Sequence, residues 1–440
     1  MLDTLKRIIL DNQEAGFDTG LTRRIAVEPV RKKATVCIGV RRGGKSTYMM
    51  QRMQRLIDNG IPRENLLHIN FFDDRLHDLQ RAGLDTIIEA YYSLYPEKKN
   101  AEAVYCFFDE IQAVEGWEPF VERLLRTEHC EVYITGSSAQ LLSREIATQM
   151  RGRALSWEIF PFSFRELLDL RGFQDPLVLS TKQRLLAQKV FAEYWEKGAF
   201  PEVIPVDRLL RIKIHQEYFQ TMLFKDIIER HNIPHPRAIV DLAHWLVDHT
   251  GSLYTINSLH GYLKSLGHKA PKSAIAEYLA WFEDAYFFFT VQIFDASLAR
   301  RNANPKKIYC IDHSLVVSTS SGILVNSGHL LENLVFVTLR RRFPTIYYYK
   351  TAQGREIDFI VPQRKERPVL IQVCETLQNP DTARREVTAL QEAMAELGLK
   401  SALIVTRNEE KEIVTDSGRI SVVPVWRFLL DFDDSSLPEG

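Results

Sequence analysis

Short apolar segments alternate with longer amphipathic segments between residues 35 and 160. This alternation is typical of a parallel β-sheet covered by helices. Four apolar segments are almost continuously hydrophobic, as strands buried on both faces of a sheet should be: residues 35–39, 66–72, 104–108 and 131–135. We therefore expect an α/β domain with a central parallel sheet over residues 1–166.

The hydrophobic period becomes helical after residue 167, and prolines punctuate it as far as residue 250. This pattern predicts a small all-helical region over residues 167–250. Two further helices, 257–264 and 272–284, are followed by an apolar strand. That order predicts a winged helix over residues 251–298.

The last part of the chain, residues 299–440, again mixes apolar strands with amphipathic helices. It begins with a basic, asparagine-rich segment, 300–307, which we expect to be a linker. The whole chain is therefore predicted to be an α/β protein in which helical and winged-helix parts lie between two sheet domains.

The composition is that of an ordinary globular protein of 440 residues, with 45% hydrophobic and 26% charged side chains. Fifty-six Lys and Arg balance 57 Asp and Glu, so any nucleic-acid surface must be a local patch. Five separated cysteines without a C-x-x-C pair argue against a zinc site or a disulfide framework. We expect a cytoplasmic protein without membrane association, because no apolar stretch is long enough to span a bilayer.

A phosphate-binding loop is predicted at residues 39–46, which fit G-x-x-x-x-G-K-[ST] directly after a strand and before a helix. Backbone N–H groups of such a loop surround phosphates, while Lys45 contacts the β- and γ-phosphates and Ser46 ligates Mg²⁺. We therefore expect ATP and Mg²⁺ as cofactors. The predicted nucleotide-binding residues are Gly39, Arg41, Arg42, Gly43, Gly44, Lys45, Ser46 and Thr47.

Two carboxylates, Asp109 and Glu110, follow the apolar strand 104–108. We expect Asp109 to reach Mg²⁺ through water and Glu110 to polarise the attacking water. A kinase needs no such base, because its substrate is the nucleophile, so this pair favours ATP hydrolysis over phosphotransfer. The alternative is an ordinary Asp-Glu cap of the next helix.

Ser137 follows the next strand and is expected within reach of the γ-phosphate, although a Gly-Ser-Ser cluster is also a common strand-to-helix turn. Arg151 or Arg153 is expected to act as an arginine finger toward the γ-phosphate of a neighbouring subunit. A solvated basic loop is the alternative for these two arginines.

In this order, residues 39–46, 109–112, 135–138, 151–153 and 161–166 resemble the archaeal and bacterial AAA+ ATPases that carry a C-terminal winged-helix and nuclease-like region. Further matches extend the resemblance over nearly the whole chain, at 198–202, 225–230, 307–312 and 356–361. The resemblance implies nucleotide bound at a subunit boundary, a helical lid and a homo-oligomer, possibly a hexameric ring. The lid motif of that family usually reads Gly-Gly-Phe-Pro, and Ala199 replaces its second glycine here.

The C-terminal part has the order of a PD-(D/E)xK nuclease with an altered site. Such a site needs two or three carboxylates and a lysine two residues after the last acid. Glu332 and Asp358 fit, whereas Gln372 and Cys374 stand where the acid and the lysine belong. Strand alternation should turn Glu375 to the opposite face.

We therefore expect a nuclease-like fold without cleavage activity. Two alternatives stay open: an atypical metal site formed by Glu332, Glu356 and Asp358, or ordinary surface and capping carboxylates at positions 332 and 358.

Basic residues suggest a surface for DNA: Lys264, Lys269, Lys272, Arg340 and Arg341. The arginines equally suit the C-terminal cap of a helix, and winged helices also bind proteins. The sequence therefore predicts an oligomeric, Mg²⁺-dependent ATPase that binds or remodels duplex or branched DNA. Alternatives are a nucleotide-dependent switch that binds protein partners and an ATP-dependent nuclease.

Overall fold

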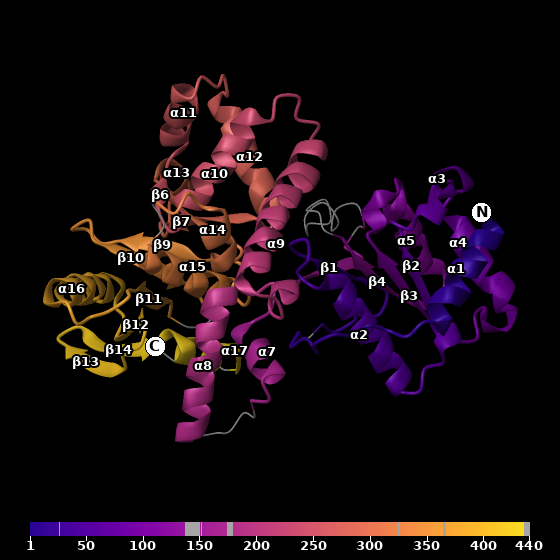
Figure 1. Cartoon of the computed structure of the whole chain (residues 1–440), viewed down its shortest axis with the longest axis horizontal. Coiled ribbons are helices and arrows are strands. Elements are labelled where there is room, and N and C mark those ends of the chain that lie inside the picture. Colours follow the sequence, from indigo (N-terminus) through magenta and orange to yellow (C-terminus); the bar gives the residue numbers. More distant parts are fainter. Residues whose placement is uncertain are drawn as a thin grey trace. The chain divides into compact units, whose positions relative to one another are not determined.

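The computed structural model of the chain describes residues 1–25, 27–136, 150, 152–173, 179–323, 326–363 and 367–434. The chain divides into two compact units, residues 1–161 and 162–440 (Figure 1). Each unit contains its own β-sheet. None of the described helices combines the length and the hydropathy needed to cross a membrane.

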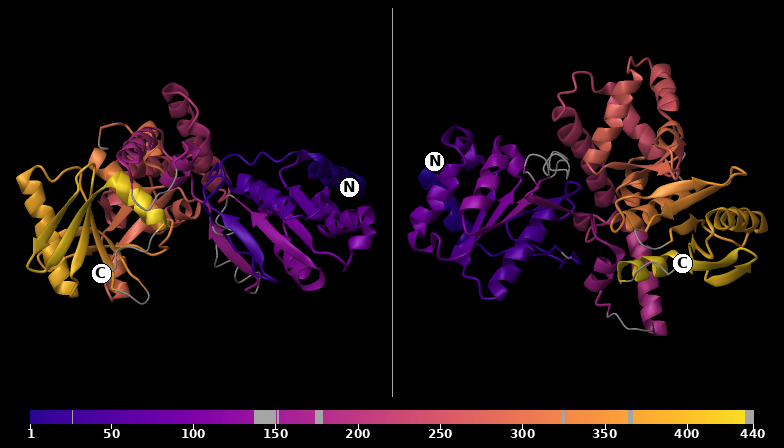
Figure 2. Two further views of the ribbon diagram at one scale, coloured as in Figure 1. Left: turned by 90° about the horizontal axis from the view of Figure 1, so that it is seen from below. Right: turned by 180° about the vertical axis from the view of Figure 1, so that it is seen from behind.

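The first unit is a five-stranded parallel sheet in the order β2-β3-β4-β1-β5, with helices on both faces (Figure 2). It confirms the four predicted strands and adds β5, whose residues are all half-buried. Because β4 lies between β1 and β3, the residue that ends β4 lies between the loops that follow its two neighbours. The elements are α1 (Leu2–Glu14), β1 (Ala34–Ile38), α2 (Lys45–Asp58), β2 (Leu66–Asn70), α3 (Leu79–Ala82), α4 (Asp85–Leu94), β3 (Val104–Asp109), α5 (Trp117–Thr127), β4 (Cys130–Thr135) and β5 (Ala154–Glu158).

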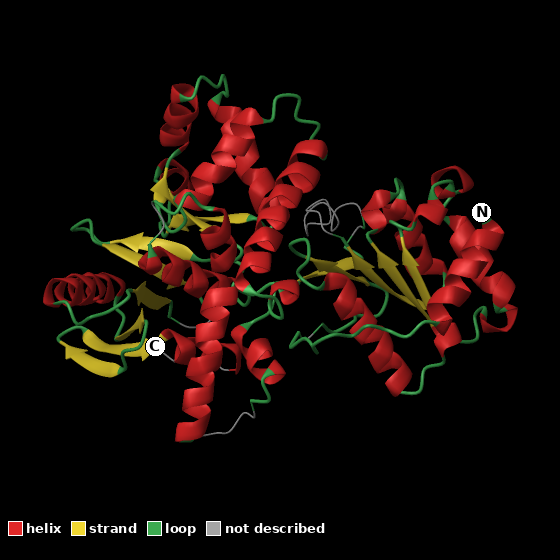
Figure 3. Cartoon of the chain, viewed as in Figure 1, coloured by secondary structure: helices red, strands yellow, loops and turns green. Residues whose placement is uncertain are grey.

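The second unit begins with helices, as predicted (Figure 3). Ser163 and Ser180 each form a capping box with the residue three positions later, which fixes where the first two helices begin. The helices are α7 (Phe164–Leu170), α8 (Thr181–Lys197), α9 (Arg208–Thr221), a π-helical segment (Met222–Glu229) and α10 (Arg237–Asp248).

Next come the elements in the order predicted for a winged helix. Strand β8 pairs antiparallel with both β6 and β7, so two helices are followed by a β-hairpin. The elements are β6 (Leu253–Tyr254), α11 (Ile256–Ser265), α12 (Lys272–Asp284), β7 (Phe288–Ile293), α13 (Leu298–Ala303) and β8 (Lys306–Cys310).

The predicted basic linker at 300–307 is wrong. Ser297 caps α13 by accepting a hydrogen bond from the backbone N–H of Arg300, and the chain then enters β8. Lys307 lies inside that strand and is buried. The basic composition suggested an exposed linker, but one of its lysines, Lys307, faces the protein interior.

The sheet of the second unit has nine strands in the order β13-β14-β12-β11-β10-β9-β7-β8-β6. Strand β7 pairs with β9 on one side and β8 on the other, so the sheet crosses the boundary predicted at residue 298. The remaining elements are α14 (His313–Thr319), α15 (Ser327–Arg340), β9 (Tyr347–Lys350), β10 (Glu356–Val361), β11 (Val369–Val373), α16 (Pro380–Leu397), β12 (Ser401–Thr406), β13 (Lys411–Thr415), β14 (Gly418–Pro424) and α17 (Val425–Asp434).

A buried carboxylate joins the helical segment to this sheet. Asp312, two residues after the end of β8, accepts a hydrogen bond of 2.6 Å from the backbone N–H of Ala199. Gly198 has a positive φ of 80°, and a side chain there would meet the Asp312 carboxylate. Ala199 itself is buried without positive φ, so its methyl group is accommodated.

Candidate functional site

The loop after β1 wraps closely against the chain after β5. Gly39 has φ 144°, and a Cβ atom there would overlap the carbonyl oxygen of Ile159. Gly44 has φ 95° and forms the N-cap of α2, which begins at Lys45. The unpaired N–H groups and the positive dipole end of α2 therefore face the inside of the loop, which is the arrangement that binds phosphate.

The side chain of Lys45 lies over the inner side of the loop. It is buried, and its Nζ donates hydrogen bonds to the carbonyl oxygens of Gly39 at 3.1 Å and Val40 at 2.9 Å. The predicted residues Arg41 and Arg42 lie at the outer bend, and Arg42 is exposed with φ 64°. The Lys45 side chain and the N-terminus of α2 therefore both face the inside of the phosphate-binding loop.

Oxygen atoms from three elements meet at the carboxyl edge of the sheet. Ser46 Oγ donates to Asp109 Oδ1 at 3.1 Å, and the hydroxyl of Thr135, at the end of β4, donates to the same oxygen. Hydroxyl and carboxylate oxygens are the hard ligands that Mg²⁺ prefers, so Ser46 and Asp109 fit the ion.

Thr135 was missed in the sequence, where Ser137 was preferred. Thr135 ends β4, which lies between β1 and β3 in the sheet. Knowing this strand order would have indicated that Thr135 lies close to Asp109. Ser137 and Arg151 lie outside the described residues, and Arg153 is half-buried. The sensor and finger roles stay predictions.

Glu110 begins its turn with a positive φ of 56°, an uncommon conformation for a residue with a side chain. Its backbone N–H donates to Thr135 Oγ1 at 3.3 Å, and Gln112 Nε2 donates to its carboxylate. The Glu110 side chain is therefore held at the edge of the sheet, one residue beyond Asp109. Glu110 is the N-cap residue of the 3₁₀ helix Ile111–Ala113, but its side chain makes no capping hydrogen bond there, contrary to the alternative of an ordinary helix cap.

A buried arginine that was not predicted, Arg23, supports the phosphate-binding loop. Arg23 donates from Nη1 to the Gly43 carbonyl at 2.8 Å and from Nη2 to the Phe160 carbonyl at 2.6 Å. A single arginine in the irregular segment before β1 carries no sequence signal of this role.

The three lysines predicted to contact DNA are exposed and lie close in the chain: Lys264 in the last turn of α11, Lys269 in the connecting turn and Lys272 at the start of α12. The other two predicted residues make internal contacts. Arg340 lies over the Phe289 ring at 5.7 Å, and Arg341 donates to the Phe162 carbonyl at 2.9 Å.

A cavity of about 750 Å³ opens in the second unit, and all four residues of the predicted degenerate nuclease site line it: Glu332, Asp358, Gln372 and Cys374. Glu332 and Asp358 are buried, so the alternative of ordinary surface carboxylates is wrong. Glu375 also lines the cavity, contrary to the alternation expected, because β11 ends at Val373.

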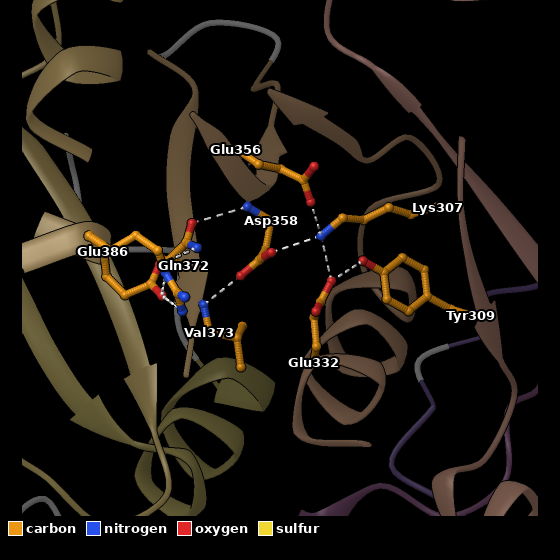
Figure 4. A network of polar contacts seen from close by, with 9 residues as sticks. Lys307, Tyr309, Glu332, Glu356, Asp358, Gln372, Val373 and Glu386 are labelled. Atoms are coloured by element: carbon orange, nitrogen blue, oxygen red, sulfur yellow. Dashed lines mark hydrogen bonds and ion pairs between the residues drawn. The ribbon is translucent and has the colours of Figure 1, made fainter. Parts of the chain in front are cut away.

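A lysine that the motif lacks at position 374 comes from another strand. Lys307 Nζ lies 2.7 Å from a carboxylate oxygen of Glu332 and 2.8 Å from one each of Glu356 and Asp358 (Figure 4). Burial favours the neutral amine, but the surrounding carboxylates outweigh it and raise the pKa of Lys307 well above its usual value. The available signal was the pair Lys306 and Lys307 at the start of the apolar segment 306–311, of which Lys307 is buried.

Gln372 is held by both of its amide atoms. Its Oε1 accepts from the backbone N–H of Asp358 at 3.2 Å, and its Nε2 donates to Glu386 at 2.7 Å (Figure 4). Glu386, on α16, is buried and was missed. Burial, and then the negative charge of Asp358, raise the pKa of Glu332 to about 7. No group of three His, Cys, Asp or Glu side chains among the described residues is arranged to hold a metal ion.

The parallel order β2-β3-β4-β1-β5, with its phosphate-binding loop after β1 and its acidic pair after β3, defines an AAA+ P-loop domain. The model of an AAA domain matches residues 31–168. Models of two domains of unknown function, DUF8612 and DUF4143, match residues 188–323 and 327–428.

The chain belongs to the same family as the uncharacterized protein MJ1544 of Methanocaldococcus jannaschii. The two are 33% identical over 97% of this chain and 95% of that protein. An uncharacterized protein of Haemophilus influenzae is 30% identical over 75% of this chain and 80% of its own length.

Solved structures are more distant. The Aeropyrum pernix ORC1 protein in complex with DNA is 12% identical, with a TM-score of 0.30 over 73% of this chain and 92% of that one. The Aeropyrum pernix ORC2 protein is 10% identical, with a TM-score of 0.34 over 76% and 92%. Likeness at this level says nothing of what this chain binds.

Proposed function

We propose that this chain is a Mg²⁺-dependent ATP hydrolase that couples nucleotide turnover to the binding or remodelling of DNA. The observation that carries the proposal is the meeting of Ser46, Asp109 and Thr135 at the sheet edge, beside Glu110 and the start of α2. Bound Mg²⁺ would neutralise charge on the phosphates.

Each residue of the site has a separate task. Lys45 and the first N–H groups of α2 bind the phosphates, and Ser46 with Asp109 holds the ion. Glu110 orients the attacking water and accepts its proton. Arg23 holds the Gly43 carbonyl and thereby the curvature of the loop.

The DNA part of the proposal rests on the exposed lysines 264, 269 and 272, at the turn between α11 and α12 where a winged helix meets phosphates. The resemblance to AAA+ ATPases further supports a homo-oligomer in which Arg151 or Arg153 reaches the nucleotide of the neighbouring subunit.

A nucleotide-dependent switch with slow turnover is the second candidate. The hydrogen bond from Gln112 favours it, because a bonded Glu110 carboxylate is less available to water. Little hydrolysis, ATP that stays bound and no response to DNA would support this switch.

The testing experiment is steady-state ATP hydrolysis at low salt without nucleic acid and with single-stranded, duplex or four-way-junction DNA. We expect stimulation by duplex or junction DNA. Glu110→Gln should bind ATP without hydrolysing it, and Lys45→Ala should weaken ATP binding itself. Glu115→Gln, at an exposed position nearby, is the matched control.

Replacing Lys264, Lys269 and Lys272 by alanine should abolish the stimulation and flatten the salt dependence of DNA binding, while basal hydrolysis persists. The same replacement at the exposed Lys182, Lys189 and Lys213 is the control. A rate that stays the same with every DNA, together with no DNA binding, would contradict the coupling. Full hydrolysis by the Glu110 and Lys45 variants would contradict the site.

A further inference from the structure

The cavity of the second unit has an internal cation at its centre. Lys307 is 2% exposed, and its ammonium group lies within 2.8 Å of one oxygen of each of three carboxylates. These carboxylates come from α15 and from two positions on β10, and Figure 4 shows them converging on the nitrogen. The lysine is thus the point where three acidic side chains meet.

The hydrogen-bond count at this nitrogen is complete. An ammonium group has three N–H donors, and here three carboxylate oxygens accept them at 2.7 Å, 2.8 Å and 2.8 Å. These are lengths of charge-assisted N–H···O bonds, whereas oxygen ligands lie about 2.0–2.6 Å from Mg²⁺ or Ca²⁺. The carboxylates are therefore spaced for an ammonium group rather than for a metal ion.

Two of the carboxylates also accept hydrogen bonds from other groups of the chain. Asp358 accepts from the backbone N–H of Val373 at 2.9 Å, and Glu332 accepts from the Tyr309 hydroxyl at 2.5 Å. A divalent ion entering here would lie beside a buried positive charge and would have to displace these bonds. Such displacement is costly, because an uncompensated buried charge is left behind.

We propose that the Lys307 ammonium occupies the cation position of this cavity and binds all three carboxylates, so that the cavity takes up no divalent metal ion. This goes beyond the proposed function, which concerns the ATP site in the other unit. It assigns the second unit a metal-free polar centre in which Lys307 replaces the ion that a nuclease would need.

The test measures Mn²⁺ binding by electron paramagnetic resonance and thermal unfolding, in EDTA and in Mn²⁺, without nucleotide. All chains carry Asp109→Asn, which removes the carboxylate proposed to hold the ion at the ATP site. The variants are Lys307→Met and, as matched control, Lys306→Met, at the half-buried neighbouring position on the same strand.

We expect the parent chain and Lys306→Met to bind no ion in the cavity and to unfold at the same temperature in both solutions. Lys307→Met should unfold at lower temperature in EDTA, bind one additional Mn²⁺ and recover several degrees of stability in its presence. Its three carboxylates then need an external cation.

Mn²⁺ bound by the parent chain and released by Asp358→Asn would overturn the proposal, and so would a folded Lys307→Met variant that ignores Mn²⁺. If Lys307→Met does not fold, the double variant Lys307→Met, Glu332→Gln leaves two carboxylates and has the same readout. The parent titration decides in any case, since a bound ion contradicts the proposal and its absence at saturating Mn²⁺ supports it.

Discussion

Gly39 and the carbonyl group of Ile159 approach each other too closely for any side chain between them. This contact sets the first bend of the phosphate-binding loop against the end of β5. The φ of 144° at Gly39 adds a second reason for glycine, since residues with a Cβ atom rarely adopt it.

We expect Gly39→Ala to destabilise the first unit by about 2–4 kcal/mol and to abolish ATP binding, because backbone must shift to admit the methyl group. Thermal unfolding and nucleotide titration measure both effects. Gly60→Ala is the control: Gly60 also has a positive φ, of 88°, but nothing lies within 4 Å of its added Cβ. Equal losses in the two variants would show that φ, not the Ile159 contact, decides.

Sequence motifs identified those site residues whose roles can be recognised from their neighbours in the chain. Lys45, Ser46, Asp109 and Glu110 were predicted because each follows a strand within a few positions of a recognisable pattern. Arg23, Thr135 and Lys307 were missed, because their roles come from contacts across the fold. Lys307 contacts Asp358, 51 residues away, and Arg23 contacts Phe160, 137 residues away.

At the level of elements, helix α15 brings Glu332 into the cavity beside β10. Burial, with the Asp358 charge second, raises the pKa of Glu332 from 4.5 to about 7, although Lys307 acts in the opposite direction. The folded chain therefore binds this proton more tightly than the unfolded chain does. The free energy of unfolding loses this contribution as the pH rises from about 4.5 to about 7.

Glu332→Gln should remove this pH dependence. Relative to the variant, the native chain is expected to lose on the order of 2–3 kcal/mol of stability between pH 4.5 and pH 7.5. Urea unfolding across this pH range measures it, and Glu277→Gln, at an exposed position, should follow the native chain. Parallel curves for the native chain and Glu332→Gln would refute the assignment.

Regular elements with a clear hydrophobic period were predicted well. The helix predicted at 272–284 has the bounds of α12, and that at 257–264 differs from α11 by one residue at each end. Strand β5 was missed because all its residues are half-buried, so it lacks the apolar run of the other strands. The first two residues of β8, Lys306 and Lys307, were assigned to the predicted linker 300–307 because that segment is basic, whereas Lys307 is buried in the strand.

At the scale of the whole molecule, the described residues form two sheets, and the predicted boundary at 298 would divide the second one. Strand β7 lies before that boundary, between β9 and β8, which both lie after it. Sequence patterns do not reveal such pairing, because strand order depends on contacts between distant segments. The division into lid, winged helix and nuclease-like domain stays a prediction.

We expect fragments 1–161 and 162–440 to fold separately, each with its own cooperative unfolding transition. Fragment 299–440 should not fold, because it lacks β6 and β7, the two strands that pair with β8. Circular dichroism and amide hydrogen exchange distinguish these outcomes. A cooperatively folded 299–440 fragment would show that the sheet has two independent parts.

The bond from Ala199 to Asp312 has an evolutionary consequence for this family. A recombinant that takes the helices before residue 250 from one member and the rest from another joins two sides that have not adapted to each other. The donor at 199, the glycine at 198 and the acid at 312 must then match by chance. Exchange at residue 161 keeps all three together, so viable hybrids are expected to have their crossover there.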